Sequence, residues 1–334
     1  MEDRQPAASP PSTALPSANR RARVFTVLKI AFTAAILTWL LWSGRLDFAE
    51  LANANLGPVS IGLCLVLGAA YLFTSHARWV IVLNIVDPRA TILGTLRYSA
   101  IGWFFNFTLP SSIGGDIVKA YYVVRDTPNP LSYVVWSSLV ERLLSFHAML
   151  AVSLGALIVW TQDIEAARFA WPVGLLFTAL TVGLVVLLSG RVRNIVVGLL
   201  RSWPKAATLV QSSCPLPKDS GAQFVTSIFS AYSLATIPQF AAVALIFVVS
   251  RAVDPTIPVE AYIFAVPLSF VFSAIPISIA GIGVGQVSLM FLLEAWTGTT
   301  SPAGPLAMTA FQVFMFVLCL PGLFAYLTIR QKRT

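Results

Sequence analysis

The stretch Gly102-Trp-Phe-Phe-Asn-Phe-Thr-Leu-Pro-Ser-Ser-Ile-Gly-Gly-Asp-Ile-Val-Lys119 decides the fold, because it interrupts an otherwise apolar part of the chain. Apolar residues run up to Leu109, and they are followed by residues that disfavour a helix: Pro110, Ser111, Ser112, Gly114 and Gly115. Asp116 can cap a new helix, and Lys119 lies one turn inside it. The sequence therefore predicts a break between two short helices.

The composition shows what surrounds this break. Hydrophobic residues make up 57% of the 334 positions and charged residues only 11%, whereas a soluble domain carries about 25% charged residues. The apolar residues come in blocks of about 17–25, the length of a membrane-spanning helix. We therefore expect an all-α, polytopic membrane protein. Broken backbone cannot face lipid, so we expect it to be buried or to line a wet cavity, as in the substrate sites of transporters.

The domain organisation follows from the same pattern. One transmembrane domain is expected over residues 20–330, between a Pro-, Ala- and Ser-rich tail at 1–19, expected to be disordered, and a short tail at 331–334. Cys64, Cys214 and Cys319 are too widely spaced for a metal or disulfide pattern, and no cofactor is expected. The net charge of +8 fits cytoplasmic loops beside anionic headgroups better than it fits nucleic acid.

Hydropathy predicts six membrane spans. Residues 80–86 are too short to form a further span, and residues 191–218 are expected to form a helix on the membrane surface. The six spans are 24–42, 56–74, 131–160, 171–188, 222–250 and 305–329. Two interrupted segments stand apart from them. Each forms a pair of apolar arms, and neither arm is long enough to cross the membrane alone. The first pair is 92–109 with 116–124, and the second is 261–275 with 287–296.

The distribution of basic residues indicates the orientation. If both termini are cytoplasmic, 18 of the 22 Lys and Arg residues fall on the cytoplasmic side, Arg142 falls within a span, and three fall in outer loops: Arg45, Arg168 and Arg251. The first interrupted segment then enters from the cytoplasm and the second from outside. Two opposed re-entrant hairpins, each following two spans, indicate an inverted repeat. The alternative is that each hairpin is a pair of short true spans.

Four motifs occur in a fixed order: Arg78-Trp79, then Asn106-Phe-Thr-Leu-Pro110-Ser-Ser-Ile-Gly-Gly-Asp116-Ile-Val-Lys119, then Glu141-Arg142, then Leu268 to Pro276-Ile-Ser-Ile-Ala-Gly-Ile-Gly-Val-Gly-Gln286. On these motifs the sequence resembles the lysylphosphatidylglycerol synthase transmembrane (flippase-like, UPF0104) family, over roughly residues 24–330. That family includes the flippase half of the multiple peptide resistance factor and stand-alone relatives linked to hopanoids or surface glycans. The resemblance implies a lipid transporter.

The sequence departs from the family pattern in three places. The family usually has Arg where Lys119 stands, and its second hairpin commonly ends in Gly-x-Gly-x-Arg-Glu where this chain has Gly283-Val-Gly285-Gln286. The two charges of that family pattern are therefore missing here. The soluble aminoacyl-transferase domain is absent, so the resemblance does not imply synthesis of the lysyl-lipid.

The first hairpin carries the main candidate site. Gly114, Gly115 and Asp116 open a helix whose free N–H groups and positive dipole end suit a phosphate, and Lys119 adds a point charge. The competing interpretation is a capped turn at the membrane surface with Lys119 reaching water. We expect Asp116 to be a cap rather than a ligand, because its charge would repel an anion.

Glu141 and Arg142 form the second candidate group. Each would cost about 2.5–3.5 kcal/mol at mid-bilayer if it were unpaired, so each is paired, wet or near an edge. In an internal position Arg142 could hold a lipid phosphate, and Glu141 could hold Arg142 or a cationic headgroup. The alternative places both residues at the cytoplasmic interface, since residues 143–160 nearly span alone. Arg78 beside Trp79 fits an interfacial anchor better than a ligand.

The second hairpin supplies weaker candidates. Pro276, Gly281 and Gly283 permit a tight turn and close helix approach, for packing or for binding, and Gln286 could offer a hydrogen bond in a cavity. His76 and His147 are isolated, and a proton-relay role is not favoured for either. The full candidate set is Arg78, Asn106, Pro110, Ser111, Ser112, Gly114, Gly115, Asp116, Lys119, Glu141, Arg142, Pro276, Gly281, Gly283 and Gln286.

Enzyme signatures are not found in the sequence, which lacks a phosphate loop, a paired-aspartate glycosyltransferase motif and a nucleophile elbow. We therefore expect a transporter that moves an anionic or modified lipid, of phospholipid, hopanoid or polyprenyl-phosphate-linked type, between leaflets of a bacterial inner membrane. Expected partners are lipids with anionic headgroups and lipid-synthesising enzymes, with no nucleic acid. The alternatives are a membrane subunit of a lipid-modifying or glycosyl-transfer system, and a scaffold for such enzymes.

Overall fold

The computed structural model describes residues 56–108, 114–160, 165–189, 221–275, 278 and 280–331, together with residues 27–28, 31, 34–35 and 38. Every regular element in these ranges is a helix, and no strand occurs among the described residues. The prediction of an all-α, polytopic membrane protein is confirmed. The predicted tail at 1–19, most of the predicted first span and the predicted surface helix at 191–218 lie outside the described residues.

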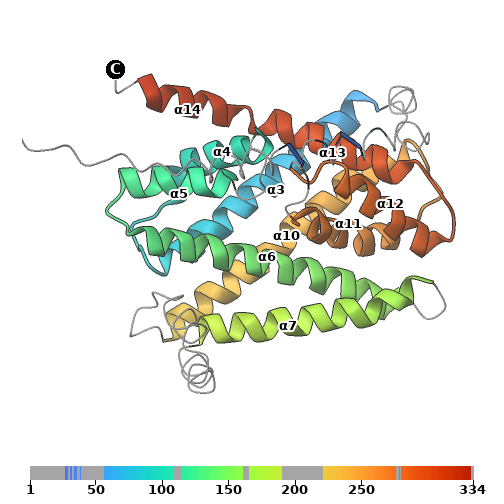
Figure 1. Cartoon of the computed structure of the whole chain (residues 1–334), viewed down its shortest axis with the longest axis horizontal. Helices are drawn as coiled ribbons and strands as arrows, with labels where there is room; N and C mark the ends of the chain where they lie inside the picture. The colour runs from blue at the N-terminus through green and yellow to red at the C-terminus, as the bar shows by residue number, and fades with distance from the viewer. Residues whose placement is uncertain are drawn as a thin grey trace, which may run out of the picture.

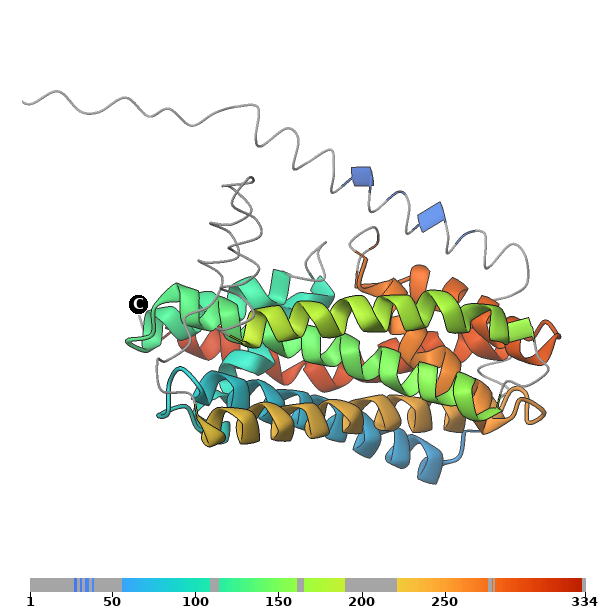
Figure 2. The same cartoon turned by 90° about the horizontal axis from the view of Figure 1, so that it is seen from below.

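Five helical segments of the described chain are long and apolar enough to cross a membrane. Four are single helices: α3 (Pro58–Asn84), α6 (Leu131–Trp160), α7 (Ala170–Leu188, after the 3-10 turn Glu165–Phe169) and α10 (Ala222–Arg251). The fifth combines α13 (Ala303–Cys319) with α14 (Pro321–Gln331). The long helices run along the longest dimension of the molecule (Figure 1), and α3 and α10 pack side by side along the lower edge of the view in Figure 2.

The two interrupted segments each form a pair of shorter helices. α4 (Ile92–Thr108) is followed by α5 (Gly114–Asp126), and α11 (Val259–Ser273) by α12 (Val284–Thr297). The two members of each pair pack against each other. At 1.5 Å per residue the 13–17 residues of these helices extend about 20–25 Å, against about 45 Å for α6. None of the four is among the five candidate spans of the described chain.

The two hairpins occupy opposite ends of the molecule (Figure 1). The first connects to the end where α3 finishes and α6 begins, and the second connects to the end where α10 finishes and α13 begins. Because α6, α7 and α10 run the length of the molecule in alternating directions, the hairpins open in opposite directions. This is the arrangement that the hydropathy pattern predicts for an inverted repeat.

One predicted boundary is wrong. The span expected at 56–74 and the short segment at 80–86 form one continuous helix, α3, because His76 and Arg78 find partners inside the protein and the helix need not end at them. The last span, expected at 305–329, is found as one candidate span, Ala303–Thr328, within which the helix is interrupted at Leu320. Pro321 lacks the N–H that would continue α13 and instead begins α14.

The second hairpin is the more deeply buried of the two. Tyr262, Phe264 and Val266 of α11 are fully buried in the largest hydrophobic cluster, which also contains residues of α3, α6, α10, α12 and α13. A smaller cluster around Trp79 and Tyr98 holds the first hairpin against α3. The helices of both hairpins are therefore packed into the helical bundle.

Candidate functional site

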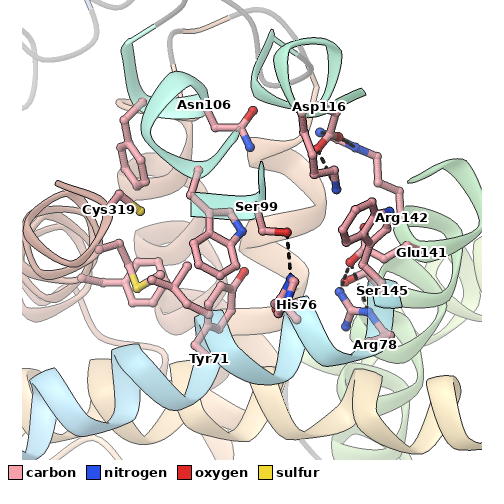
Figure 3. Close-up of a pocket in the computed structure, with 18 residues that line it drawn as sticks. Tyr71, His76, Arg78, Ser99, Asn106, Asp116, Glu141, Arg142, Ser145 and Cys319 are labelled. Atoms are coloured by element: carbon pink, nitrogen blue, oxygen red, sulfur yellow. Dashed lines mark hydrogen bonds and ion pairs between the residues drawn. The ribbon is translucent and has the colours of Figure 1, made fainter. Parts of the chain in front are cut away.

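A cavity of about 260 Å³ lies beside the first hairpin, between α3, α4, α5, α6 and α13 (Figure 3). Five charged side chains line it: Arg78 from α3, Asp116 and Lys119 from α5, and Glu141 and Arg142 from α6. These residues lie far apart in the sequence, and all five belong to the predicted set. The structure therefore brings together the candidates of the first hairpin and those of α6.

Arg78 and Glu141 form an ion pair in the wall of the cavity. The Arg78 guanidinium donates to Oε1 of Glu141 from both Nε, at 3.2 Å, and Nη2. The Arg78 side chain is only 2% exposed and that of Glu141 15%. A buried guanidinium needs such a counter-ion, because an unpaired charge inside a protein costs several kcal/mol. The interpretation of Arg78 and Trp79 as an interfacial anchor is therefore wrong, since both side chains are buried within the bundle.

A second ion pair joins α5 to α6. Arg142 donates from Nε to Oδ2 of Asp116 at 2.5 Å, and its Nη2 contacts the same oxygen. The other carboxylate oxygen, Oδ1, lies 3.6 Å from Nζ of Lys119. Asp116 is the third residue of α5, and its side chain points into the cavity toward these cations rather than back onto the helix end (Figure 3). The expectation that Asp116 is a helix cap is therefore wrong.

Lys119 is held in an unusual position for a lysine. Its side chain is 9% exposed, and its ammonium lies 4.3 Å from the centre of the Trp79 ring. A cation over an indole face is attracted by the ring quadrupole. With Asp116 on one side and Trp79 on the other, Lys119 does not reach out to the membrane surface, so the interpretation of a lysine extended to water is wrong.

Asn106 supplies the cap that was expected from Asp116. Its Oδ1 accepts a hydrogen bond of 3.0 Å from the N–H of Gly115 at the start of α5. A side chain on Gly115 would collide with the main chain of α4, because a Cβ there would lie 1.9 Å from the carbonyl oxygen of Gly102. Gly114 and Gly115 are both buried. The Gly115 N–H is already used by Asn106, so these glycines serve close helix packing.

His76 is also part of the cavity wall. Its Nε2 lies 2.8 Å from the carbonyl oxygen of Ile92, and its Nδ1 lies 2.8 Å from Oγ of Ser99. Because a carbonyl oxygen can only accept, Nε2 carries a proton. In the neutral ring Nδ1 then accepts the hydrogen bond from the Ser99 hydroxyl. His76 therefore links α3 to α4 at two points, Ile92 and Ser99.

A second cavity of about 270 Å³ continues from the first. Both are lined by Tyr71, Asn106, Phe107, Glu141, Arg142, Ser145 and Phe311. The second cavity reaches α11 and the turn after it, through Phe270, Ser273, Ala274 and Ala280. The hollow space thus extends from one hairpin to the other, and its wall changes from charged to mainly apolar along the way.

Gly281, Gly283 and Gln286, the described candidates of the second hairpin, do not line this space. Gly281 and Gly283 have positive φ angles of 74° and 86°, which a side chain disfavours, and Gly281 also packs against Ser273. Gln286 is 1% exposed. Its Oε1 accepts from the Gly283 N–H at 2.7 Å, and its Nε2 donates to Oε1 of Gln312 at 2.8 Å and Oγ1 of Thr309 at 3.2 Å. The expectation that Gln286 faces the cavity is therefore wrong.

Of the predicted set, Arg78, Asn106, Asp116, Lys119, Glu141 and Arg142 line the cavities. Pro110, Ser111, Ser112 and Pro276 lie outside the described residues. Several further lining residues were not predicted: Tyr71, Ser75, Ser99, Trp103, Ser145 and Gln312. On α3 the lining residues recur at helical spacing, from Tyr71 through Ser75 to Arg78, so the polar stripe was present in the sequence.

Comparison with known proteins places the chain among relatives. The model of the family described as "Lysylphosphatidylglycerol synthase TM region" matches residues 26–322. A protein named "UPF0104 membrane protein" from Methanothermobacter thermautotrophicus is 29% identical over 154 residues, which are 44% of this chain and 41% of the relative. This match spans less than half the length of that relative. Since the family match covers most of the chain, the protein is a multi-pass membrane protein that belongs to the lysylphosphatidylglycerol synthase TM region family.

Proposed function

We propose that this protein moves a lipid with an anionic headgroup from one leaflet of the membrane to the other. The observation that carries the proposal is the continuous hollow between two half-length hairpins that open toward opposite ends, with Lys119 and Arg142 in its wall. Charged side chains within membrane-spanning helices are costly, so five of them around one cavity indicate a functional site rather than a simple membrane anchor. Family membership supports a role in lipid chemistry.

The proposed mechanism keeps the lipid tails in the bilayer while the headgroup crosses through the protein. The headgroup phosphate enters the charged cavity from one side and is neutralised by the Lys119 ammonium and the Arg142 guanidinium. Motion of one hairpin and its neighbouring helices relative to the other then opens the second cavity toward the opposite leaflet. No covalent step forms part of this proposal, so the protein acts as a transporter and not as an enzyme.

We also propose that the membrane is the bacterial inner membrane and that both termini are cytoplasmic. The excess of Lys and Arg in the segments that the sequence pattern assigns to one side of the membrane supports this orientation. Arg78 and Lys119 were counted with those segments and lie in the cavity instead, yet the remaining bias keeps the same sign. Cysteine labelling of the two ends from each side of sealed vesicles tests the orientation.

The test of transport uses the purified full chain in liposomes that contain a lipid labelled on its headgroup. Leaflet exchange is measured as the fraction of label that a membrane-impermeant reductant reaches over time. We expect the protein to accelerate exchange of an anionic lipid, and we expect Lys119→Ala and Arg142→Ala each to slow it by about tenfold or more. Arg97→Ala is the matched control, because Arg97 lies on α4 with its side chain 54% exposed and does not line the cavities.

Two outcomes would contradict the proposal. If wild-type protein moves none of a panel of anionic, zwitterionic and glycosylated lipids, transport loses its support, and the alternative of a membrane subunit of a lipid-modifying system gains it. If Lys119→Ala and Arg142→Ala both move lipid as fast as the Arg97→Ala control, the cavity is not the route.

A further inference from the structure

The carboxylate of Asp116 lies between two of the cations of the first cavity, Arg142 and Lys119. One of its oxygens is bound by Arg142 and the other lies 3.6 Å from the Lys119 ammonium. This is the arrangement that a bound phosphate would adopt, with separate oxygens shared between a guanidinium and an ammonium. Asp116 is therefore placed as an internal substitute for an anionic ligand.

The formal charge of the cavity wall limits the negative charge that a bound ligand can carry. Three cations (Arg78, Lys119, Arg142) face two carboxylates (Asp116, Glu141), so with His76 neutral the wall carries a formal charge of +1. Glu141 is committed to Arg78, which is too deeply buried to lose its counter-ion cheaply. One negative charge on the ligand then balances the site, whereas a second would leave an uncompensated charge in a poorly hydrated space.

We propose that Lys119 and Arg142 bind a lipid phosphodiester that carries one negative charge, in exchange for the Asp116 carboxylate, and that Asp116 makes the site select a monoanion over a dianion. This inference rests on the proposed function and names the class of lipid that the same site takes. When the phosphate binds, the Asp116 carboxylate leaves Arg142, and the ion pair between α5 and α6 breaks.

The adjoining cavity favours a lipid over a soluble phosphate ester. Its wall beyond the charged region contains Phe146, Met149, Phe270, Met308 and Phe311. Apolar side chains of this kind stabilise the glycerol backbone and the first carbons of a chain, and they offer nothing to a free anion. A ligand that fills both cavities has its charged group near Lys119 and its apolar part toward the second hairpin.

Competition by an internal carboxylate lowers the apparent affinity for the ligand, because only the fraction of protein with the carboxylate displaced can bind. Removing the charge of Asp116 should therefore strengthen binding, which is the opposite of the usual effect of changing a site residue. It should strengthen dianion binding more than monoanion binding, since the wall then carries a formal charge of +2.

The experiment measures binding to the purified full chain in a neutral detergent at pH 8, where a phosphomonoester carries close to two charges. The probes are dihexanoyl phosphatidylglycerol, dihexanoyl phosphatidic acid and deacylated glycerophosphoglycerol. For Asp116→Asn we expect affinity for the phosphatidylglycerol probe to rise about tenfold, and the preference for phosphatidic acid over phosphatidylglycerol to rise about tenfold as well. For wild type we expect the deacylated probe to bind more weakly than its dihexanoyl counterpart.

Two further variants keep the test decisive. Asp126→Asn removes a carboxylate from the same helix outside the cavity and should leave both affinities unchanged. Lys119→Gln keeps the Asp116–Arg142 pair, gives the wall no net charge, and should lower phosphatidylglycerol affinity about tenfold; this result can be read even if Asp116→Asn fails to fold.

The proposal is overturned if folded Asp116→Asn binds phosphatidylglycerol no more tightly than wild type, or if Lys119→Gln keeps the wild-type affinity. It is also overturned if the deacylated probe binds as well as the lipid, which would assign the site to a soluble anion. These results concern affinity in detergent, so each can occur while wild-type protein still exchanges lipid between leaflets.

Discussion

Replacing Glu141 by glutamine removes the carboxylate that pairs with Arg78 while keeping nearly the same side-chain volume. The Arg78 guanidinium would remain 2% exposed, with a neutral amide in place of its counter-ion. Breaking a buried ion pair by removing one partner costs about 3–5 kcal/mol, because the other charge stays buried and uncompensated. The cost here should lie near the lower end, about 3 kcal/mol, since Glu141 faces a cavity in which water can partly replace it.

The measurement is the free energy of unfolding of purified protein in mixed micelles, followed by steric trapping or by denaturant titration with a tryptophan signal. A double variant separates the charge effect from the shape effect. Arg78→Met with Glu141→Met removes both charges, and replacing a buried ion pair by apolar residues is often neutral or stabilising. We therefore expect the double variant to be more stable than Glu141→Gln alone, despite carrying two changes.

Asp126→Asn is the control for the loss of a carboxylate at the end of a helix. Asp126 pairs with Arg125 and Arg97, and the Arg97 side chain is 54% exposed. Such pairs contribute about 0–1 kcal/mol, so this variant should lose much less stability. The reasoning fails if Glu141→Gln is as stable as Asp126→Asn, or if the double variant is no more stable than the single one.

Three further predictions concern the stability of the fold. Gly115→Ala should lower the free energy of unfolding by about 1–3 kcal/mol or more, because its Cβ would lie 1.9 Å from the Gly102 carbonyl oxygen. The control is Gly155→Ala, where nothing lies within 4 Å of the added carbon, and its melting temperature should be the higher of the two. Gln286→Ala leaves the buried Gly283 N–H without the acceptor that it has at 2.7 Å, so it should cost about 1–3 kcal/mol, while the exposed Gln223→Ala should cost little in the same melting assay. Hydrogen bonds from Thr256 and Ser301 hold the pKa of Asp254 below its ordinary value despite partial burial. Asp254 therefore stabilises the fold at pH values above its pKa in the unfolded chain, and this contribution is lost as the pH falls through its lower pKa in the folded protein. The melting temperatures of wild type and Asp254→Asn should differ at pH 6 and converge at strongly acid pH.

Helix positions were largely predictable from the sequence because they depend on local composition. The break after Thr108 follows from proline, serine and glycine within a few residues. The length of α6 follows from a mainly apolar, proline-free stretch that ends at Trp160 and in which only Glu141 and Arg142 are charged. The opposed hairpins follow from counting spans and basic residues. Each of these inferences uses only neighbours in the chain or the total length of a segment.

The wrong predictions share a different cause. The end of a span was placed at His76 and Arg78 because a polar residue in an apolar run indicates the membrane edge when no partner is known. The partners are Ser99, 23 residues away, and Glu141, 63 residues away. Asp116 is expected to be a cap because its charge would repel an anion, and the sequence does not show that its partner is Arg142, 26 residues further along. Pairings across such distances depend on how helices pack, which a single sequence does not reveal.

The ion pairs also distinguish a structural role from a functional one. A buried salt bridge contributes little net stability compared with well-packed apolar residues, because desolvation offsets most of the attraction. If stability alone determined these positions, Arg78 and Glu141 could be apolar at no cost, and the double Met variant would fold and still move lipid. The proposed function predicts a different result. Glu141 lines both cavities, so the methionines remove polar wall from the path of the headgroup, and leaflet exchange by the stable double variant falls below the wild-type rate even though the wall keeps its formal charge of +1. A stable double variant that exchanges lipid at the wild-type rate would show that this pair holds α3 to α6 and does nothing more.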